Sequence, residues 1–123
     1  MKCVDWAIRL EWAAIAVAAI AAYAMTGGSW AFFGLLVLAP DLSMLGYLAG
    51  PRVGAVCYNA FHILVWPVLL ILAGLYTGSQ HAMEIALIWL VHISVDRALG
   101  YGLKLPGSFQ DTHLGRIGRR INP

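Results

Sequence analysis

The chain has 123 residues, of which 61% are apolar and only 11% are charged, and its formal net charge is +2. A soluble domain averages about half apolar and a quarter charged residues, so this composition indicates a small membrane protein of one domain. Cys3 and Cys57 form no Cys-x-x-Cys motif, which argues against a disulfide framework and against a cysteine-based zinc site.

Four apolar runs follow one another along the chain, at residues 4–24, 30–48, 53–76 and 82–99. Each is close to the ~20 residues that a helix needs to cross a bilayer, where backbone hydrogen bonds must be satisfied internally. The connectors 26–29, 49–52 and 77–80 are short, which makes consecutive helices antiparallel neighbours. The sequence therefore predicts an all-α fold: a compact antiparallel four-helix transmembrane bundle within residues 1–104, followed by an interfacial tail at 105–123.

The basic residues gather at one end of the predicted helices. They lie near the N-terminus, in the second connector and at or after the end of the fourth helix: Lys2, Arg9, Arg52, Arg97, Lys104, Arg116, Arg119 and Arg120. By the positive-inside rule, both termini and the 49–52 connector are predicted to be cytoplasmic. Because this rule already explains their placement, the basic residues give little support for a nucleic-acid partner.

Polar side chains from all four predicted helices fall into one layer. Counting 1.5 Å per residue from the cytoplasmic ends places them roughly 5–13 Å inside the membrane. They are Glu11, Asp41, Asn59, His62, His92 and Asp96. Asn59 and His62 are spaced i, i+3, and His92 and Asp96 are spaced i, i+4, so each pair shares a helix face. Charged groups are costly in hydrocarbon and usually face a bundle interior, which makes this layer the candidate functional site.

Two prolines are predicted to interrupt the second and third helices. Pro40 cannot donate to the carbonyl of Leu36, so we expect a kink or break there, with Asp41 in the first turn of the second half, where a helix N-terminus favours an anion. Pro67 likewise frees the carbonyl of Ile63, beside the histidine of this helix. Breaks of this kind are tolerated in membranes where they line a cavity or where neighbours satisfy the freed groups.

The tail is too polar and glycine-rich to span a membrane. Asp111 or Thr112 is expected to cap a short turn. The apolar residues Leu114, Ile117 and Ile121 are spaced i, i+3 and i+7, opposite Arg116, Arg119 and Arg120, which predicts a short interfacial helix on anionic lipid. In the alternative, Arg97, Lys104 and His113 fold over the cytoplasmic mouth and bind a phosphate or a lipid headgroup.

Several stretches of the chain resemble one protein family. They are RLE (9–11), APDLSMLGYLAGPRVGAVCYNAFH (39–62), ALIWLVHISVDRALGYGLK (86–104) and FQDTHLGRIG (109–118). Together they are similar to the bacterial membrane-protein family catalogued as domain of unknown function 4260 (DUF4260). The resemblance implies a small four-helix protein of the bacterial inner membrane, and it implies no particular reaction.

The polar layer stands on motif positions of that family. So do four residues at or beyond the end of the fourth helix: Arg97, Lys104, Asp111 and His113. This chain departs from the pattern at Ile63 and Leu64, where the family usually has threonine and tyrosine, so no polar role is expected there.

The first functional hypothesis is a metal-dependent or acid/base site that opens to the cytoplasm, because imidazoles and carboxylates are the ligands that zinc, iron and manganese use. The candidate metal ligands are Asp41, His62, His92 and Asp96, and the candidate catalytic groups are Asp41, His92 and Asp96. The candidate ligand-binding residues are Glu11, Asn59, Arg97, Lys104 and His113. A lipid-borne or amphipathic substrate would suit a site at this depth.

Two alternatives stay open. In one, the chain is a non-catalytic accessory subunit or a homo-oligomer, in which the polar layer only fixes helix register and the alanine-rich first helix packs closely against another helix. In the other, His62 and His92 ligate a haem, or the acids relay protons during transport. A visible absorption band would identify the haem, and bound metal would identify the metal site.

Overall fold

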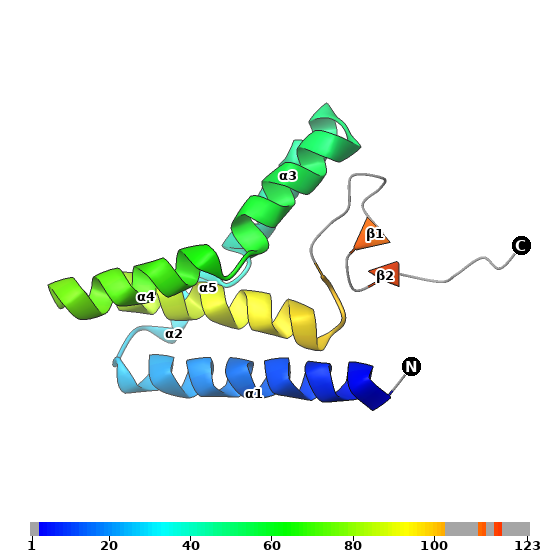
Figure 1. The fold of residues 1–123 in the computed structure, drawn as a ribbon. Helices are drawn as coiled ribbons and strands as arrows, with labels where there is room; N and C mark the ends of the chain where they lie inside the picture. Colours follow the sequence, from blue (N-terminus) through cyan, green and yellow to red (C-terminus); the bar gives the residue numbers. More distant parts are fainter. Residues whose placement is uncertain (1–2, 103–110, 113–114, 117–123) are drawn as a thin grey trace, which may run out of the picture.

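The computed structural model describes residues 3–102, 111–112 and 115–116, and nearly all of them are helical. The helices are α1 (Cys3–Met25), α2 (Trp30–Leu36), the 3-10 helix η1 (Ala39–Ala49), α3 (Pro51–His62), α4 (Val65–Thr77) and α5 (Gln80–Ala98). The strands β1 (Asp111–Thr112) and β2 (Gly115–Arg116) pair antiparallel. The predicted all-helical class is thus confirmed for the part of the chain that precedes the tail (Figure 1).

The described residues of the tail differ from the prediction. Asp111–Thr112 and Gly115–Arg116 pair as antiparallel strands, whereas the sequence predicted a cap at Asp111 or Thr112 and a helix that includes Arg116. Aspartate, threonine and glycine are poor helix formers, which explains why apolar spacing alone was misleading in this short stretch. The rest of the predicted tail helix lies outside the described residues.

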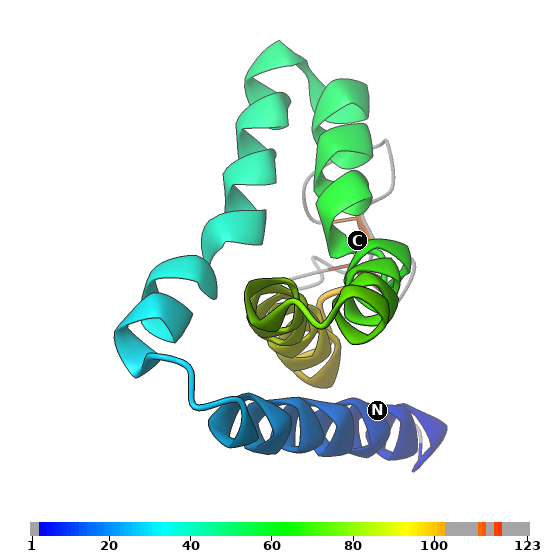
Figure 2. The same ribbon diagram turned by 90° about the vertical axis from the view of Figure 1, so that its left-hand side faces the viewer.

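The helices form three tiers. The antiparallel pair α4 and α5 lies in the middle, α1 packs against one side of it, and η1 with α3 projects from the other side (Figures 1 and 2). The core lies between α1 and α5, where Ala19 and Tyr23 meet Leu87, Ile88 and Val91. Small alanine side chains let the two helix backbones approach closely, as is usual between membrane helices.

Helices η1 and α3 form a hairpin of their own, called the hairpin below (residues 39–62). A Cβ atom at Gly46 would stand 2.7 Å from Cβ of Cys57, and one at Gly54 would overlap the ring of Tyr47. These two glycines therefore let the two helices touch. Because the hairpin projects away from α4 and α5 and leaves α1 on their opposite side, the structure does not confirm a single compact four-helix bundle (Figure 1).

Two of the four predicted spans are interrupted. The 30–48 span divides into α2 and η1, with Pro40 at the start of η1, as predicted. The 53–76 span divides at Ile63, whose φ of −94° and ψ of 149° are extended. That break comes four residues before Pro67, which falls in the first turn of α4, where a missing N–H removes no helical hydrogen bond.

Most of the outer surface is apolar. Three helical stretches are long and apolar enough to cross a membrane, namely Cys3–Met25, Trp30–Ala49 and Pro51–Thr77, and at most 22% of each is buried within the protein. Leu48 and Tyr76, for example, are 87% and 95% exposed. Such a surface suits a lipid environment and would be unusual in water.

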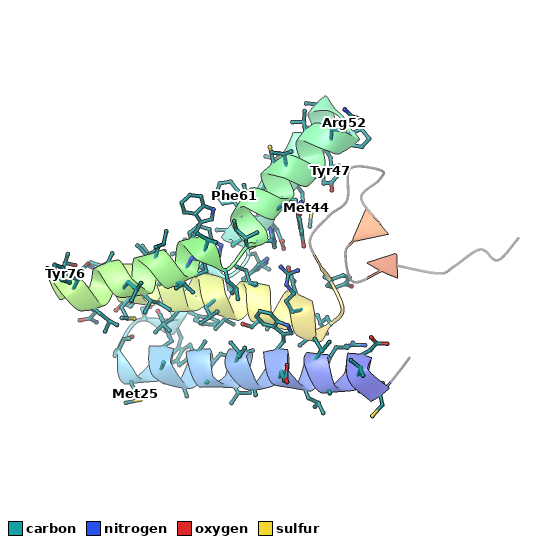
Figure 3. The ribbon with its side chains drawn as sticks, in the orientation of Figure 1. Met25, Met44, Tyr47, Arg52, Phe61 and Tyr76 are labelled. Atoms are coloured by element: carbon teal, nitrogen blue, oxygen red, sulfur yellow. The ribbon has the colours of Figure 1, made fainter. Side chains whose placement is uncertain are left out.

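Helix α5 differs from these three stretches. It carries charges at Glu84, Asp96 and Arg97, and nine of its residues are buried, Glu84 and Arg97 among them. It therefore forms the centre of the protein, with α1, α4 and the hairpin arranged around it. Met25 and Tyr76 lie at one end of the molecule, and the N-terminus and Arg52 lie away from that end (Figures 1 and 3).

Candidate metal centre

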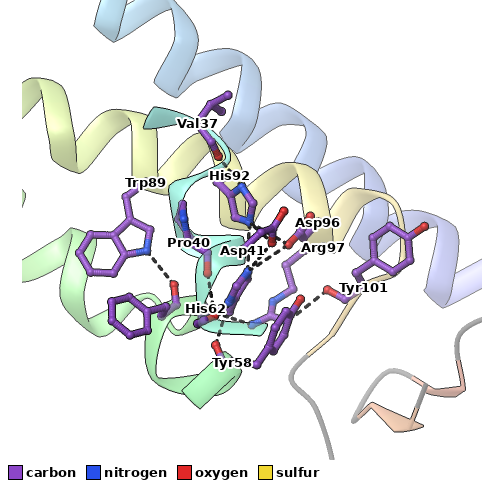
Figure 4. A network of polar contacts seen from close by, with 12 residues as sticks. Val37, Pro40, Asp41, Tyr58, His62, Trp89, His92, Asp96, Arg97 and Tyr101 are labelled. Carbon is purple, nitrogen blue, oxygen red and sulfur yellow. Dashed lines mark hydrogen bonds and ion pairs between the residues drawn. The ribbon is translucent and has the colours of Figure 1, made fainter. Parts of the chain in front are cut away.

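Four predicted metal ligands come together where the hairpin meets α5. Asp41 and His62 come from the hairpin, and His92 and Asp96 come from α5 (Figure 4). One potential ligand atom of each residue lies within 4.8 Å of all the others. We call these four residues the His/Asp cluster. Both imidazoles are buried, whereas the side chains of Asp96 and Asp41 are 20% and 36% exposed.

The shortest distances within the cluster join imidazole nitrogens and carboxylate oxygens. Nε2 of His92 lies 3.0 Å from Nε2 of His62, 3.0 Å from Oδ1 of Asp41 and 3.3 Å from Oδ2 of Asp96. Nε2 of His62 lies 3.2 Å from Oδ1 of Asp41 and 3.5 Å from Oδ2 of Asp96. The four atoms thus surround a single point.

Each imidazole is oriented through its other nitrogen. Nδ1 of His62 lies 2.7 Å from the carbonyl oxygen of Tyr58, and Nδ1 of His92 lies 2.5 Å from that of Val37. A carbonyl oxygen can only accept, so Nδ1 carries the proton in both rings, and in a neutral ring Nε2 then presents a lone pair. A carbonyl partner on the far nitrogen is the usual second contact of a metal-binding histidine.

The carbonyl of Val37 is free to accept from His92 because residue 40 is a proline. In a 3-10 turn the carbonyl of Val37 would accept from residue 40, which is a proline and has no N–H. The next N–H, that of Asp41, donates to Leu38 instead, at 3.0 Å. The sequence had pointed to the carbonyl of Leu36, as it would in a continuous α-helix, but the tighter 3-10 winding of η1 shifts the freed acceptor by one residue.

Side chains of α5 satisfy the carbonyls at the end of α3. Nε1 of Trp89 donates to the carbonyl of Phe61 at 2.7 Å, and Nη2 of Arg97 donates to that of His62 at 3.0 Å. A helix end leaves its last carbonyls without partners inside the helix, and these two bonds satisfy two of them. The break at Ile63, and hence the position of His62, therefore depends on α5.

Aromatic rings complete the surroundings of the cluster. The ring of Tyr58 stacks on the ring of His62 with a centroid distance of 3.7 Å. The guanidinium of Arg97, which is buried, lies 6.0 Å from the ring centre of Trp12 on α1. One alternative placed Arg97 over the cytoplasmic mouth; in the structure its guanidinium donates to the carbonyl of His62 at the end of α3.

The spacing of the cluster matches the ligand shell of a small ion. Tetrahedral zinc binds nitrogen and oxygen at about 2.0–2.2 Å, so neighbouring ligand atoms stand about 3.3–3.6 Å apart. The five distances that join the imidazole Nε2 atoms to each other and to the carboxylates range from 3.0 to 3.5 Å, close to this spacing or slightly shorter. Two neutral imidazoles and two carboxylates also sum to a formal charge of −2, which one divalent cation cancels.

The other predicted site residues do not join the cluster. Glu11 lies on an exposed face of α1, and Asn59 is half-buried on α3. Arg97 lies beside the cluster and contacts the backbone of His62. Lys104 and His113 lie outside the described residues.

A second polar group on α5 was not predicted. Glu84 is 4% exposed, and its Oε1 accepts from Nε2 of Gln80 at 2.7 Å. The same Nε2 donates to the carbonyl of Thr26 at 2.9 Å, and Oη of Tyr23 donates to the carbonyl of Ser29 at 2.6 Å. We call these five residues the Glu84 cluster. Glu84 lies only two residues inside its predicted span. The sequence alone does not distinguish a buried acid at that position from an acid at the membrane interface.

The comparisons with known proteins give a family without an activity. The family model described as a domain of unknown function (DUF4260) matches residues 5–117, so the chain belongs to this family. No curated protein and no solved structure matches the chain. The chemistry of the site must therefore be argued from its own residues.

Proposed function

We propose that the protein binds one divalent transition-metal ion, with zinc as the first candidate, between Asp41, His62, His92 and Asp96. The observation that carries this proposal is that two Nε2 atoms lie 3.0 Å from each other and 3.0–3.5 Å from two carboxylate oxygens, with all four atoms within 4.8 Å of one another. These atoms are all acceptors when both rings are neutral, and four acceptors at such distances repel one another unless a cation lies between them.

The donor set narrows the identity of the ion. Calcium and magnesium prefer shells made of oxygen alone, whereas two imidazoles with two carboxylates suit zinc, iron or manganese. Zinc is the first candidate among these, because it binds four nitrogen and oxygen ligands in a compact tetrahedral shell. Bound there, the ion would supply a Lewis acid; the chain itself fixes both imidazoles through Tyr58 and Val37 and keeps Asp41 partly exposed, at 36% of its side chain.

The site would lie within the membrane. In this proposal α1, α2 with η1, α3 with α4, and α5 are four passes of a multi-pass protein of the bacterial inner membrane. The separation of Arg52 and the N-terminus from the turns near Met25 and Tyr76 supports termini on the cytoplasmic side (Figures 1 and 3). A neutral metal cluster would also be tolerated in hydrocarbon far better than two unpaired carboxylates.

The haem alternative has less support. Two axial imidazoles must stand on opposite faces of a macrocycle. Here the two Nε2 atoms are 3.0 Å apart, and both also approach the carboxylate of Asp41. A purely structural cluster would require added protons shared among the four acceptors, and metal analysis distinguishes such a cluster from a metal site.

The test is metal analysis of the purified protein, with matched histidine variants. We expect about one equivalent of metal in the wild type and its loss in His92→Ala, because three remaining ligands would hold the ion much more weakly. His81→Ala is the control, since the His81 side chain is 88% exposed and lies outside the cluster. The proposal fails if the wild type holds no metal after exposure to zinc, iron or manganese, or if His92→Ala holds as much as His81→Ala.

A further inference from the structure

An apolar groove opens beside the His/Asp cluster. It has a volume of about 180 Å³, and its walls include Leu36, Ala39, Pro40, Phe61, Ile88 and Trp89. An apolar cavity of about 150 Å³ is enough to hold a benzene-sized molecule, so the groove has room for a segment of hydrocarbon chain. It lies between α2, η1, α3 and α5, on the apolar surface of the protein.

Residues that line the groove are close in sequence to the candidate metal ligands. Pro40 immediately precedes Asp41, and Phe61 immediately precedes His62. Trp89 stands one helical turn before His92 and joins the two walls through its bond to Phe61. In Figure 4, Trp89 and Pro40 lie to one side of the imidazoles, whereas Arg97 and Tyr101 lie on the other side.

The cluster is accessible along its carboxylate edge. The histidine side chains are 2% and 4% exposed, but that of Asp41 is 36% exposed. A tetrahedral metal can accept a fifth ligand, so an oxygen atom that arrives beside Asp41 can reach the ion without loss of a protein ligand. The buried guanidinium of Arg97 beyond the cluster would favour an anionic group there.

We propose that the site binds a single-chain amphiphile, with its hydrocarbon chain in the groove and a carboxylate or phosphate head at the metal. This inference rests on the proposed metal site and adds the class of ligand. The occupant is lipid-like because the groove faces a surface of exposed apolar side chains, such as Phe61 at 48% and Ile85 at 39%. The head is an oxygen anion because both the ion and Arg97 attract one.

The experiment uses the full-length protein in lipid nanodiscs, loaded with Co²⁺ as an optical probe of coordination. Dodecanoate is added at increasing mole fraction in the bilayer, and acetate is added in parallel as a head without a chain. We expect dodecanoate to change the visible Co²⁺ spectrum in the wild type. Acetate, which has no chain to place in the groove, should act only at much higher concentration.

A substitution that fills the groove should weaken the response to dodecanoate but not the response to acetate. Ala39→Leu places a larger side chain in the groove, and overpacking of this kind should raise the half-saturating fraction of dodecanoate about tenfold while the response to acetate stays unchanged. Ala60→Leu is the matched control, because Ala60 is exposed and does not line the groove. If Ala39→Leu fails to retain Co²⁺, Ile85→Phe fills the groove from α5 and provides the same comparison.

The possible failures are distinguishable. If no Co²⁺ spectrum forms in the wild type, the metal site itself is refuted. If Co²⁺ binds but dodecanoate acts no better than acetate, or acts equally on the groove variants and on Ala60→Leu, the metal site stands and the amphiphile proposal is overturned. In that case the groove holds only a chain of bulk lipid.

Discussion

Two polar clusters lie on α5, and they differ in how their groups are paired. In the Glu84 cluster donors meet acceptors, because Gln80 donates to Glu84 and to Thr26 and Tyr23 donates to Ser29. In the His/Asp cluster acceptors meet acceptors, and the two Nε2 atoms and two carboxylates face one another. The first arrangement is complete as it stands, whereas the second would be completed by the proposed cation.

This difference separates a packing role from a binding role. Buried polar groups that satisfy one another hold two turns together, as Gln80 does between the start of α5 and the turn after α1. Buried acceptors that lack donors at their centre raise the free energy of the protein unless a ligand binds. A buried polar residue of α5 thus has a packing role where it faces a donor and a binding role where it faces other acceptors.

The largest expected effect comes from removal of the metal. Zinc at 1,000 times its dissociation constant should stabilise the wild type by about 4 kcal/mol relative to chelator-treated protein. Thermal unfolding in detergent measures this difference. His62→Ala should show little response to zinc, because it lacks one ligand and the stacked ring on Tyr58. An equal zinc response in both proteins would place the ion elsewhere.

Removal of the metal with a chelator should increase hydrogen exchange near the His/Asp cluster but not near the Glu84 cluster. The metal would tie the hairpin to α5, since each contributes two ligands. Hydrogen exchange should therefore rise in residues 39–62 after chelation and stay unchanged at the turns around Thr26 and Ser79, where Gln80 and Glu84 need no ion. This pattern, and not the total stability alone, distinguishes the two clusters.

The next effect concerns the hairpin that carries Asp41 and His62. Gly54→Ala would force a Cβ atom into the ring of Tyr47, and we expect a loss of about 1–3 kcal/mol together with weaker metal binding. Gly34→Ala is the matched control: no atom lies within 4 Å of the added Cβ, so the variant should gain about 0.5–1 kcal/mol from helix propensity. Denaturation and metal titration of both variants test the sign reversal.

Much of the His/Asp cluster could be predicted from the sequence. The fixed rise of a helix gave the common depth of Asp41, His62, His92 and Asp96, and the i, i+4 spacing placed the last two on one face. Pro40 predicted the break beside Asp41, which is confirmed. These rules concern residues that are close in sequence, so they apply without knowledge of the tertiary structure.

The sequence did not predict how each helix is rotated about its axis or which contacts form between helices. Glu11 has the right depth, but it stands about 80–140° around α1 from Ala16, Ala19 and Tyr23, which face the core. It therefore points outward, and α1 contributes Trp12 near Arg97 instead. The break at Ile63 could not be located because it depends on α5, which caps the end of α3.

A smaller effect of opposite sign is expected at Asp41. Without metal, Asp41→Asn should stabilise the protein by about 1 kcal/mol, because it removes one of two facing carboxylates. With saturating zinc the same variant should be less stable than the wild type, because it loses a charged ligand. Unfolding measured with chelator and with zinc gives both signs. A variant that is destabilised equally in both conditions would argue for a structural cluster.

The smallest effect is expected at Glu84. Glu84→Gln retains an oxygen that can accept from Nε2 of Gln80, and it removes a charge that is 4% exposed. The lost charge-assisted bond and the lower cost of burial oppose each other, so the free energy of unfolding should change by less than about 0.5 kcal/mol. Metal content should stay at the wild-type value. A large loss of stability or of metal would mean that the charge of Glu84 serves the distant site, and the two clusters would then have to be treated as one.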